Sequence, residues 1–183
     1  LGSTGCGKTT AMLADMGNPR RLVVWSPKEE IDGYARRWPG CFLIRGDAGA
    51  AVQLLEIVRA AGTAGRFKVV IRPPVNRGQA EKLFDVVCRI VMKARDVTMI
   101  AEELHTVTRA SCAPDGWSEL IMMGRGYGAA IYGCSQRPAA MDKDFLGNCS
   151  RVRVGRLAFP DDAKVVAKAL GVRPEVVLSL SGF

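Results

Sequence analysis

Short apolar runs rich in Val and Ile recur along the chain, and each is followed by a longer stretch in which apolar residues have helical spacing. This alternation predicts parallel strands connected by helices, because a helix must carry the chain back before the next strand begins. We therefore expect an α/β fold. The predicted strands are Leu22–Trp25, Cys41–Ile44, Phe67–Ile71, Val97–Ala101, Ala129–Cys134 and Arg151–Val154. The predicted helices are Lys8–Asp15, Ala48–Ala61, Gly78–Arg95, Gly116–Met123 and Asp161–Leu170.

The composition is that of one folded domain. The 183 residues suffice for a single core, and 48% apolar with 24% charged residues excludes a disordered chain. No apolar segment is long enough to span a membrane, and none near the start resembles a signal peptide. The six cysteines form no C-x-x-C pair, so we expect reduced thiols. We therefore expect a cytoplasmic location.

The chain is basic, with 26 Lys plus Arg against 18 Asp plus Glu and a formal charge of +8. This balance favours a polyanionic partner such as nucleic acid. The densest basic groups are Arg20-Arg21, Arg36-Arg37 and the set Arg151, Arg153 and Arg156. Each group is a candidate for phosphate contacts, with a solvated surface as the alternative.

Residues 2–9, G-S-T-G-C-G-K-T, match the phosphate-loop pattern G-x-x-x-x-G-K-[ST] at every specified position. Glycines let the backbone curl until its N–H groups point at phosphate oxygens, and the helix that begins at Lys8 adds its dipole. We expect ATP as the ligand, with Lys8 on the β and γ phosphates and the Thr9 hydroxyl on Mg²⁺. The candidate nucleotide-binding residues are Gly2, Ser3, Thr4, Gly5, Cys6, Gly7, Lys8, Thr9 and Thr10. The alternatives are a glycine-rich turn that caps a helix and, for Thr10, a plain helix residue.

A phosphate loop normally follows a buried strand, and here only Leu1 precedes it. We expect a further N-terminal segment that supplies this strand, because the neighbouring strands would otherwise expose unpaired edges in the middle of the sheet. Residues 1–183 are thus predicted to be a single phosphate-loop ATPase domain that lacks its first strand.

Two acids, Glu102 and Glu103, directly follow the predicted strand Val97–Ala101. Beside a phosphate loop, the first acid can hold Mg²⁺ through water and the second can polarise the attacking water. We assign Glu102 to the metal and Glu103 to the catalytic base. The alternative is a helix N-terminus that favours acids. His105 is the only histidine and is a candidate to orient Glu103, to sense the γ phosphate or to serve a structural role.

Gln136 follows the next predicted strand, so its amide should lie beside the acidic strand end. It is a candidate sensor of the γ phosphate and the attacking water, or an amide that fixes a loop. Before that strand, Arg125 lies in G-R-G-Y-G, where glycines free the backbone. We consider Arg125 a candidate arginine finger for a neighbouring subunit, with Arg137 and Arg109 in reserve and a solvated surface arginine as the alternative.

Together, G-S-T-G-C-G-K-T-T, M-I-A-E-E-L-H, G-R-G-Y-G and C-S-Q-R-P resemble the HerA/FtsK superfamily of ring-forming DNA-pumping ATPases, which includes viral genome-packaging ATPases. The resemblance covers about residues 2–162 and ends in R-L-A-F-P-D-D. It implies a RecA-like, three-layer P-loop NTPase core with an additional strand and a catalytic glutamate. It also implies a homo-oligomeric ring around double-stranded DNA, and it matches Glu103 to the catalytic glutamate and Gln136 to the sensor. Glu102 departs from the family, which usually has Asp there.

The small size favours a viral or prophage packaging ATPase, for which a virion vertex or membrane protein is a further possible partner. A small-molecule kinase of similar length is one alternative, but paired acids with Gln136 favour hydrolysis over transfer to an acceptor. A filamentous-phage assembly ATPase and a slow nucleotide-gated binding module are the others.

Overall fold

The strands pair in parallel into one sheet. The computed structural model describes residues 1–3 and 5–181, and within these a five-stranded sheet has the order β2-β3-β1-β4-β5. The strands are β1 (Arg21–Trp25), β2 (Phe42–Arg45), β3 (Phe67–Arg72), β4 (Thr98–Ala101) and β5 (Ala130–Gly133). The predicted α/β class is confirmed, and the ends of these five strands lie within one residue of the prediction.

The chain divides into two compact units. The sheet unit comprises Asn18–Glu102 and Pro114–Gly133 and contains all five strands. The phosphate-loop unit comprises Leu1–Gly17, Glu103–Ala113 and Cys134–Phe183. The boundary between the units falls between the two adjacent acids, Glu102 and Glu103. The prediction of a single domain with an additional strand before Leu1 stays a prediction.

The core of the sheet unit is built on β1. All five residues of this strand are buried, as expected for a central strand covered on both faces. The Trp25 ring lies edge-on to Phe84 at 4.9 Å between ring centroids, and Phe84 lies 5.3 Å from Trp117. These three rings have no exposed surface, so they fix the packing of the sheet against its helices.

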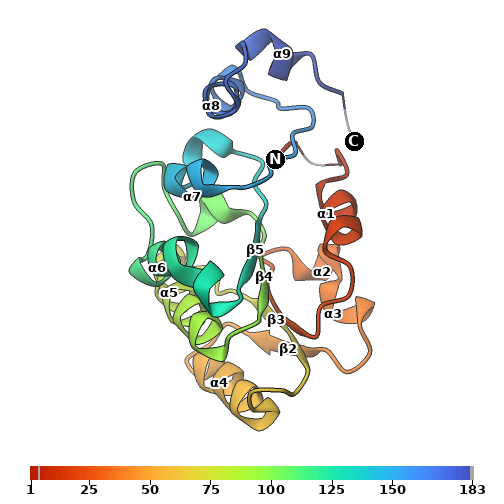
Figure 1. Cartoon of the computed structure of the whole chain (residues 1–183), viewed down its shortest axis with the longest axis vertical. Helices are drawn as coiled ribbons and strands as arrows, with labels where there is room; N and C mark the ends of the chain where they lie inside the picture. The colour runs from red at the N-terminus through yellow and green to blue at the C-terminus, as the bar shows by residue number, and fades with distance from the viewer. Residues whose placement is uncertain (4, 182–183) are drawn as a thin grey trace. The chain divides into compact units, whose positions relative to one another are not determined.

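Helices lie on both faces of the sheet unit. Figure 1 shows α4, α5 and α6 on one side of the strands and the short α2 and α3 on the other. Their bounds are α2 (Glu29–Asp32), α3 (Tyr34–Arg37), α4 (Ala50–Ala61), α5 (Arg77–Ala94) and α6 (Asp115–Met123), followed by the 3₁₀ turn η2 (Gly124–Tyr127). This arrangement is the layered one predicted for the fold.

The phosphate-loop unit is helical. Its elements are α1 (Lys8–Met16), η1 (Leu104–Thr106), η3 (Pro138–Ala140), α7 (Lys143–Asn148), α8 (Pro160–Leu170) and α9 (Pro174–Leu178). Helices α8 and α9 share a small core of Leu157, Ala163, Val166, Ala167 and Val177. Within the described part of the chain, no helix has the length and apolar character needed to cross a lipid bilayer.

The sixth predicted strand, Arg151–Val154, is wrong. This segment is extended but forms no β-ladder with another strand. Its described backbone hydrogen bonds are made with the first residues of the chain. The Leu1 nitrogen donates to the Arg153 carbonyl at 2.7 Å, and Gly155 N–H donates to the Leu1 carbonyl at 2.9 Å. These two bonds have the pattern of a parallel pair, but they are too few to form a strand.

Arg21 is structural and not a surface contact for phosphate. It is 5% exposed, and its guanidinium donates to the carbonyls of Gly62, Thr63, Gly65 and Ala94 at 2.8–3.2 Å. These carbonyls lie at and beyond the ends of α4 and α5, where helical carbonyls have no partner within the helix. Arg21 therefore connects the C-terminal ends of α4 and α5 to the start of β1.

Replacing Arg21 with Ala should lower the free energy of unfolding by about 3 kcal/mol, because four partly buried carbonyls lose a charged donor. The neighbouring Arg20 is the matched control, because its one side-chain bond to the residues that the structure describes is to the Ala64 carbonyl at an exposed site. Arg20→Ala should change stability by less than about 0.5 kcal/mol. Urea unfolding followed by tryptophan fluorescence measures both, and equal effects of the two substitutions would contradict this role of Arg21.

Candidate functional site

The phosphate loop has the backbone that its glycines predict. Gly5 and Gly7 have φ of +76° and +84°, which glycine adopts without a steric penalty. Gly7 is the N-cap of α1, so the helix begins at Lys8 as expected. The Lys8 ammonium donates to the Ser3 carbonyl at 2.9 Å and folds back over the loop.

The other loop residues differ in their exposure. Cys6 is buried and Ser3 is half-buried, and the Ser3 hydroxyl has no hydrogen-bond partner among the described residues. A buried hydroxyl of this kind fits a loop that closes around an oxygen-rich ligand. Thr9 is half-buried and Thr10 is exposed on the first turn of α1. Thr4 lies outside the described residues.

Glu103 has a left-handed backbone conformation, and a hydrogen bond fixes its carboxylate. Its φ and ψ are +49° and +48°, a left-handed conformation that costs a non-glycine residue about 1–3 kcal/mol and recurs at functional sites. The side chain is buried, and Oε1 accepts a hydrogen bond from the Gln136 amide. His105 Nδ1 lies 3.5 Å from Glu103 Oε2 and 3.1 Å from the Ser135 hydroxyl. The proximity expected for the acid and the amide is therefore found within the phosphate-loop unit.

Two backbone bonds connect these segments. Leu104 N–H donates to the Cys134 carbonyl at 2.9 Å, and Gly2 N–H donates to the Ser135 carbonyl at 3.2 Å. The loop that carries Gln136 thus contacts both the segment of Glu103 and the start of the phosphate loop.

Glu102 belongs to the sheet unit and has a partner that sequence reasoning missed. It is 4% exposed, and its Oε1 accepts a hydrogen bond from the Tyr34 hydroxyl. Its N–H donates to the Trp25 carbonyl at 2.9 Å, which continues the pairing of β4 with β1. Nothing in the sequence signals Tyr34, because the contact depends on the fold.

The candidate arginines have different surroundings. Arg125 is exposed on η2, and its guanidinium has no hydrogen bond or ion pair to any residue that the structure describes. Arg137 donates to Asp162 at 3.1 Å and lies 4.4 Å from the centre of the Phe159 ring. Arg109 pairs through its backbone with Cys112. Arg137 is therefore engaged within its own unit, whereas Arg125 is available to a partner.

No protein-only metal cage is present among the described residues, since no three His, Cys, Asp or Glu side chains are grouped to hold an ion. Mg²⁺ in phosphate sites takes most ligands from phosphates and water and needs only one or two side chains. The Thr9 hydroxyl and the Glu102 carboxylate are oxygen donors of the kind that Mg²⁺ prefers.

Comparison with known proteins found no matching family model. The chain is 26% identical over 152 residues to protein P9 of Pseudoalteromonas phage PM2, covering 82% of this chain and 63% of that protein. It is 33% identical over 87 residues to a probable helicase of Methanocaldococcus jannaschii, covering 44% of this chain and 17% of that protein. The chain therefore spans less than two thirds of the length of either relative.

Solved structures are similar in fold. The genome packaging NTPase B204 of Sulfolobus turreted icosahedral virus 2 in complex with AMPPCP has a TM-score of 0.61 at 11% identity, with 100% of this chain and 86% of that chain covered. Its complex with ATP-gammaS has a TM-score of 0.56 at 14% identity, with 91% and 90% covered. At these identities the likeness shows the fold alone, and it agrees with the parallel α/β sheet described above.

Proposed function

We propose that this chain is an Mg²⁺-dependent ATP hydrolase that moves double-stranded DNA as a homo-oligomeric ring, most like the viral packaging ATPases of the HerA/FtsK superfamily. The observation that carries the proposal is the combination, within one unit, of the glycine-shaped loop around Lys8 and the bond between Glu103 and Gln136. The similar fold of a genome packaging NTPase and the partial likeness to a probable helicase support it. A host cytoplasm or virion location, with a virion vertex or membrane protein as partner, belongs to the same proposal.

ATP is held by the phosphate loop in this proposal. The N–H groups of residues 2–9 surround the phosphates, and the Lys8 ammonium exchanges the Ser3 carbonyl for phosphate oxygens, which are stronger acceptors because they are charged. Thr10, one residue beyond the loop pattern, contacts the α phosphate.

Thr9 and Glu102 are the proposed metal residues. The Thr9 hydroxyl would hold Mg²⁺ directly, and Glu102 would hold it through water. The ion, when bound, neutralises charge on the phosphates during transfer.

Glu103 is the proposed base and Gln136 the proposed sensor. The hydrogen bond from the Gln136 amide orients the buried Glu103 carboxylate. Any other acceptor that competes for the same amide N–H would therefore change this bond. A γ phosphate near Gln136 would compete in this way, and the amide would then transmit the state of the nucleotide to Ser135 and the phosphate loop.

Two substitutions separate binding from hydrolysis. Lys8→Ala should weaken ATP binding by at least about tenfold, because a charged hydrogen bond to phosphate is lost. Glu103→Gln should bind ATP normally and lower kcat by about 10²–10⁴-fold, because it removes the base and leaves the loop intact. Equilibrium dialysis and a phosphate-release assay measure the two effects. Hydrolysis by Glu103→Gln at the native rate would refute the assignment of the base.

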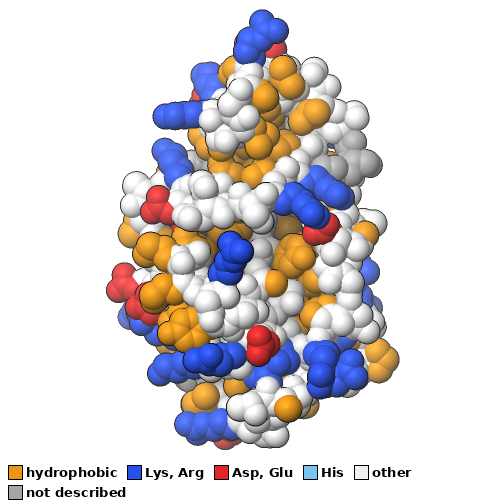
Figure 2. Space-filling model, in the orientation of Figure 1, with side chains coloured by type: hydrophobic (Ala, Val, Ile, Leu, Met, Phe, Trp, Pro, Cys, Tyr) orange, Lys and Arg blue, Asp and Glu red, His pale blue; other side chains and the backbone are white. Residues whose placement is uncertain are grey.

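DNA is the proposed polyanionic partner. Figure 2 shows more Lys and Arg than acidic side chains on the visible face, in agreement with the charge of +8. Arg36, Arg45 and Arg72 line a cavity of about 340 Å³ at the carboxyl ends of β2 and β3, together with Glu29 and Glu30. Arg72 is half-buried and paired with Glu30, whereas Arg36 and Arg45 are exposed and suit contacts to a phosphate backbone.

Affinity for double-stranded DNA should therefore fall steeply with salt and vary little with base sequence. A ring that contacts six or more phosphates should lose about 10³-fold in affinity between about 50 and 200 mM salt. Fluorescence anisotropy with two duplexes of unrelated sequence, in the presence of an ATP analogue, measures this. Equal affinity at both salt concentrations would contradict a DNA motor.

Arg125 is the proposed arginine finger for the neighbouring subunit, because it is exposed and has no described partner in its own chain. Arg125→Ala should lower kcat by roughly 10³-fold or more. Mixing Arg125→Ala with Glu103→Gln should restore part of the activity, since some interfaces then pair an intact Glu103 site with an intact Arg125.

Mixing Lys8→Ala with Glu103→Gln is the control. Both defects lie in the subunit that binds the nucleotide, so no interface regains an intact site. Recovery in this control, or none in the Arg125 mixture when mixed rings are shown to form, would remove Arg125 from the role in trans.

A further inference from the structure

We infer that Tyr34 is the positioning residue for Glu102, and that the tyrosine hydroxyl sets the orientation of this carboxylate. The inference rests on the proposed function, because it concerns how the proposed metal acid is held.

The contact joins two buried polar groups. The Tyr34 side chain has no exposed surface, Glu102 is 4% exposed, and the hydroxyl donates to Glu102 Oε1. A buried hydroxyl needs a partner, and a buried carboxylate needs donors, so each group stabilises the other in place. Both residues belong to the sheet unit, so the contact lies within one compact body.

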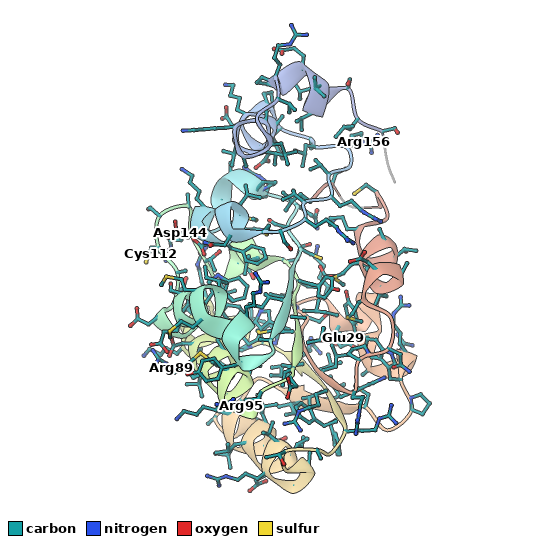
Figure 3. The ribbon with its side chains drawn as sticks, in the orientation of Figure 1. Glu29, Arg89, Arg95, Cys112, Asp144 and Arg156 are labelled. Atoms are coloured by element: carbon teal, nitrogen blue, oxygen red, sulfur yellow. The ribbon has the colours of Figure 1, made fainter. Side chains whose placement is uncertain are left out.

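Tyr34 is itself fixed by a second buried acid. It opens α3, a single turn too short to be stable alone. The Glu29 carboxylate, 6% exposed, accepts from the N–H groups of Tyr34 at 3.1 Å and Ala35 at 2.7 Å. Figure 3 labels Glu29, which lies on α2 directly before this turn. Gly33, with φ of +61°, lets the chain break between the two short helices.

Packing holds the tyrosine ring as well. The ring stacks on Trp38 with centroids 6.3 Å apart and planes inclined by 21°, and the Arg37 guanidinium lies 6.0 Å from its centre. The backbone of Tyr34 and the face of its ring are thus both held, and this fixes the position of the hydroxyl.

The backbone of Glu102 is fixed from the other side. Its N–H donates to the Trp25 carbonyl, which extends the β1–β4 register beyond Ala101. Because the Glu102 backbone and the Tyr34 hydroxyl are both fixed, the length of the side chain at position 102 decides whether its carboxylate reaches the hydroxyl. Aspartate is shorter by one methylene group, so Glu102 and Tyr34 form a matched pair.

The test measures metal binding without turnover. Mn²⁺ serves as the probe, and electron paramagnetic resonance measures free Mn²⁺ during titration of the protein saturated with β,γ-methylene ATP. Tyr34→Phe should raise the Mn²⁺ dissociation constant by about tenfold, the size typical when a hydrogen bond to a metal-binding side chain is lost. Nucleotide affinity in EDTA should stay within about twofold of native, because the phosphate loop is unchanged.

Tyr127→Phe is the matched control. It removes a hydroxyl from η2, where the Tyr127 ring contacts the Arg95 guanidinium, and it should leave Mn²⁺ affinity unchanged.

Glu102→Asp should reproduce the loss of Mn²⁺ affinity seen in Tyr34→Phe, and the double variant should lose no more affinity than either single variant. Additive losses in the double variant would overturn the matched pair. If Tyr34→Phe is unfolded, Glu102→Asp alone tests the same contact, and native Mn²⁺ affinity in that variant would overturn the inference.

Glu102→Ala distinguishes the metal role of Glu102 from the positioning role of Tyr34. Weak Mn²⁺ binding by Glu102→Ala with native binding by Tyr34→Phe would overturn the inference and leave the proposed function intact. Native Mn²⁺ binding by Glu102→Ala would refute the metal role of Glu102 and the inference with it.

Discussion

The backbone of Cys134 and Ser135 is the constraint on which the candidate site depends. The Cys134 carbonyl accepts from Leu104 N–H, and the Ser135 carbonyl accepts from Gly2 N–H. Three segments far apart in sequence therefore meet at two consecutive peptide groups. Because side-chain positions follow the backbone, these bonds bring the phosphate loop, Glu103 and Gln136 into one unit. The same loop is fixed at its far end by Asp162, which binds both Arg137 and the Ala139 N–H.

Glu103 is held in a left-handed backbone conformation, which is unfavourable for any residue other than glycine. A left-handed glutamate persists only where surrounding contacts outweigh its strain, and here Leu104, Thr106 and Gln136 supply them. Such a residue has little freedom to relax when a ligand arrives. A carboxylate of fixed direction is what a base needs if it is to act on one water molecule in one position.

The sequence predicts the five strands of the sheet to within one residue, because short Val-rich and Ile-rich runs between helical stretches are typical of buried parallel strands. It fails at Arg151–Val154, where alternating Arg and Val suggest a strand but a ladder needs a partner. It misses α2 and α3, since single turns of four residues are too short to show a periodicity, and α3 depends on the buried Glu29 carboxylate. The meeting of Glu103 and Gln136 was predictable from strand ends, whereas Tyr34 and Glu102 are 68 residues apart and meet only through packing.

The central claim is that the phosphate loop, Glu103 and Gln136 form one nucleotide site. A crystal structure of the chain with β,γ-methylene ATP and Mg²⁺ tests it most directly. We expect the triphosphate within the loop of residues 2–9, the Lys8 ammonium on the β and γ phosphates, and the Gln136 amide within hydrogen-bond distance of the γ phosphate or its adjacent water. A triphosphate bound away from residues 2–9, or a γ phosphate remote from both Glu103 and Gln136, would contradict it.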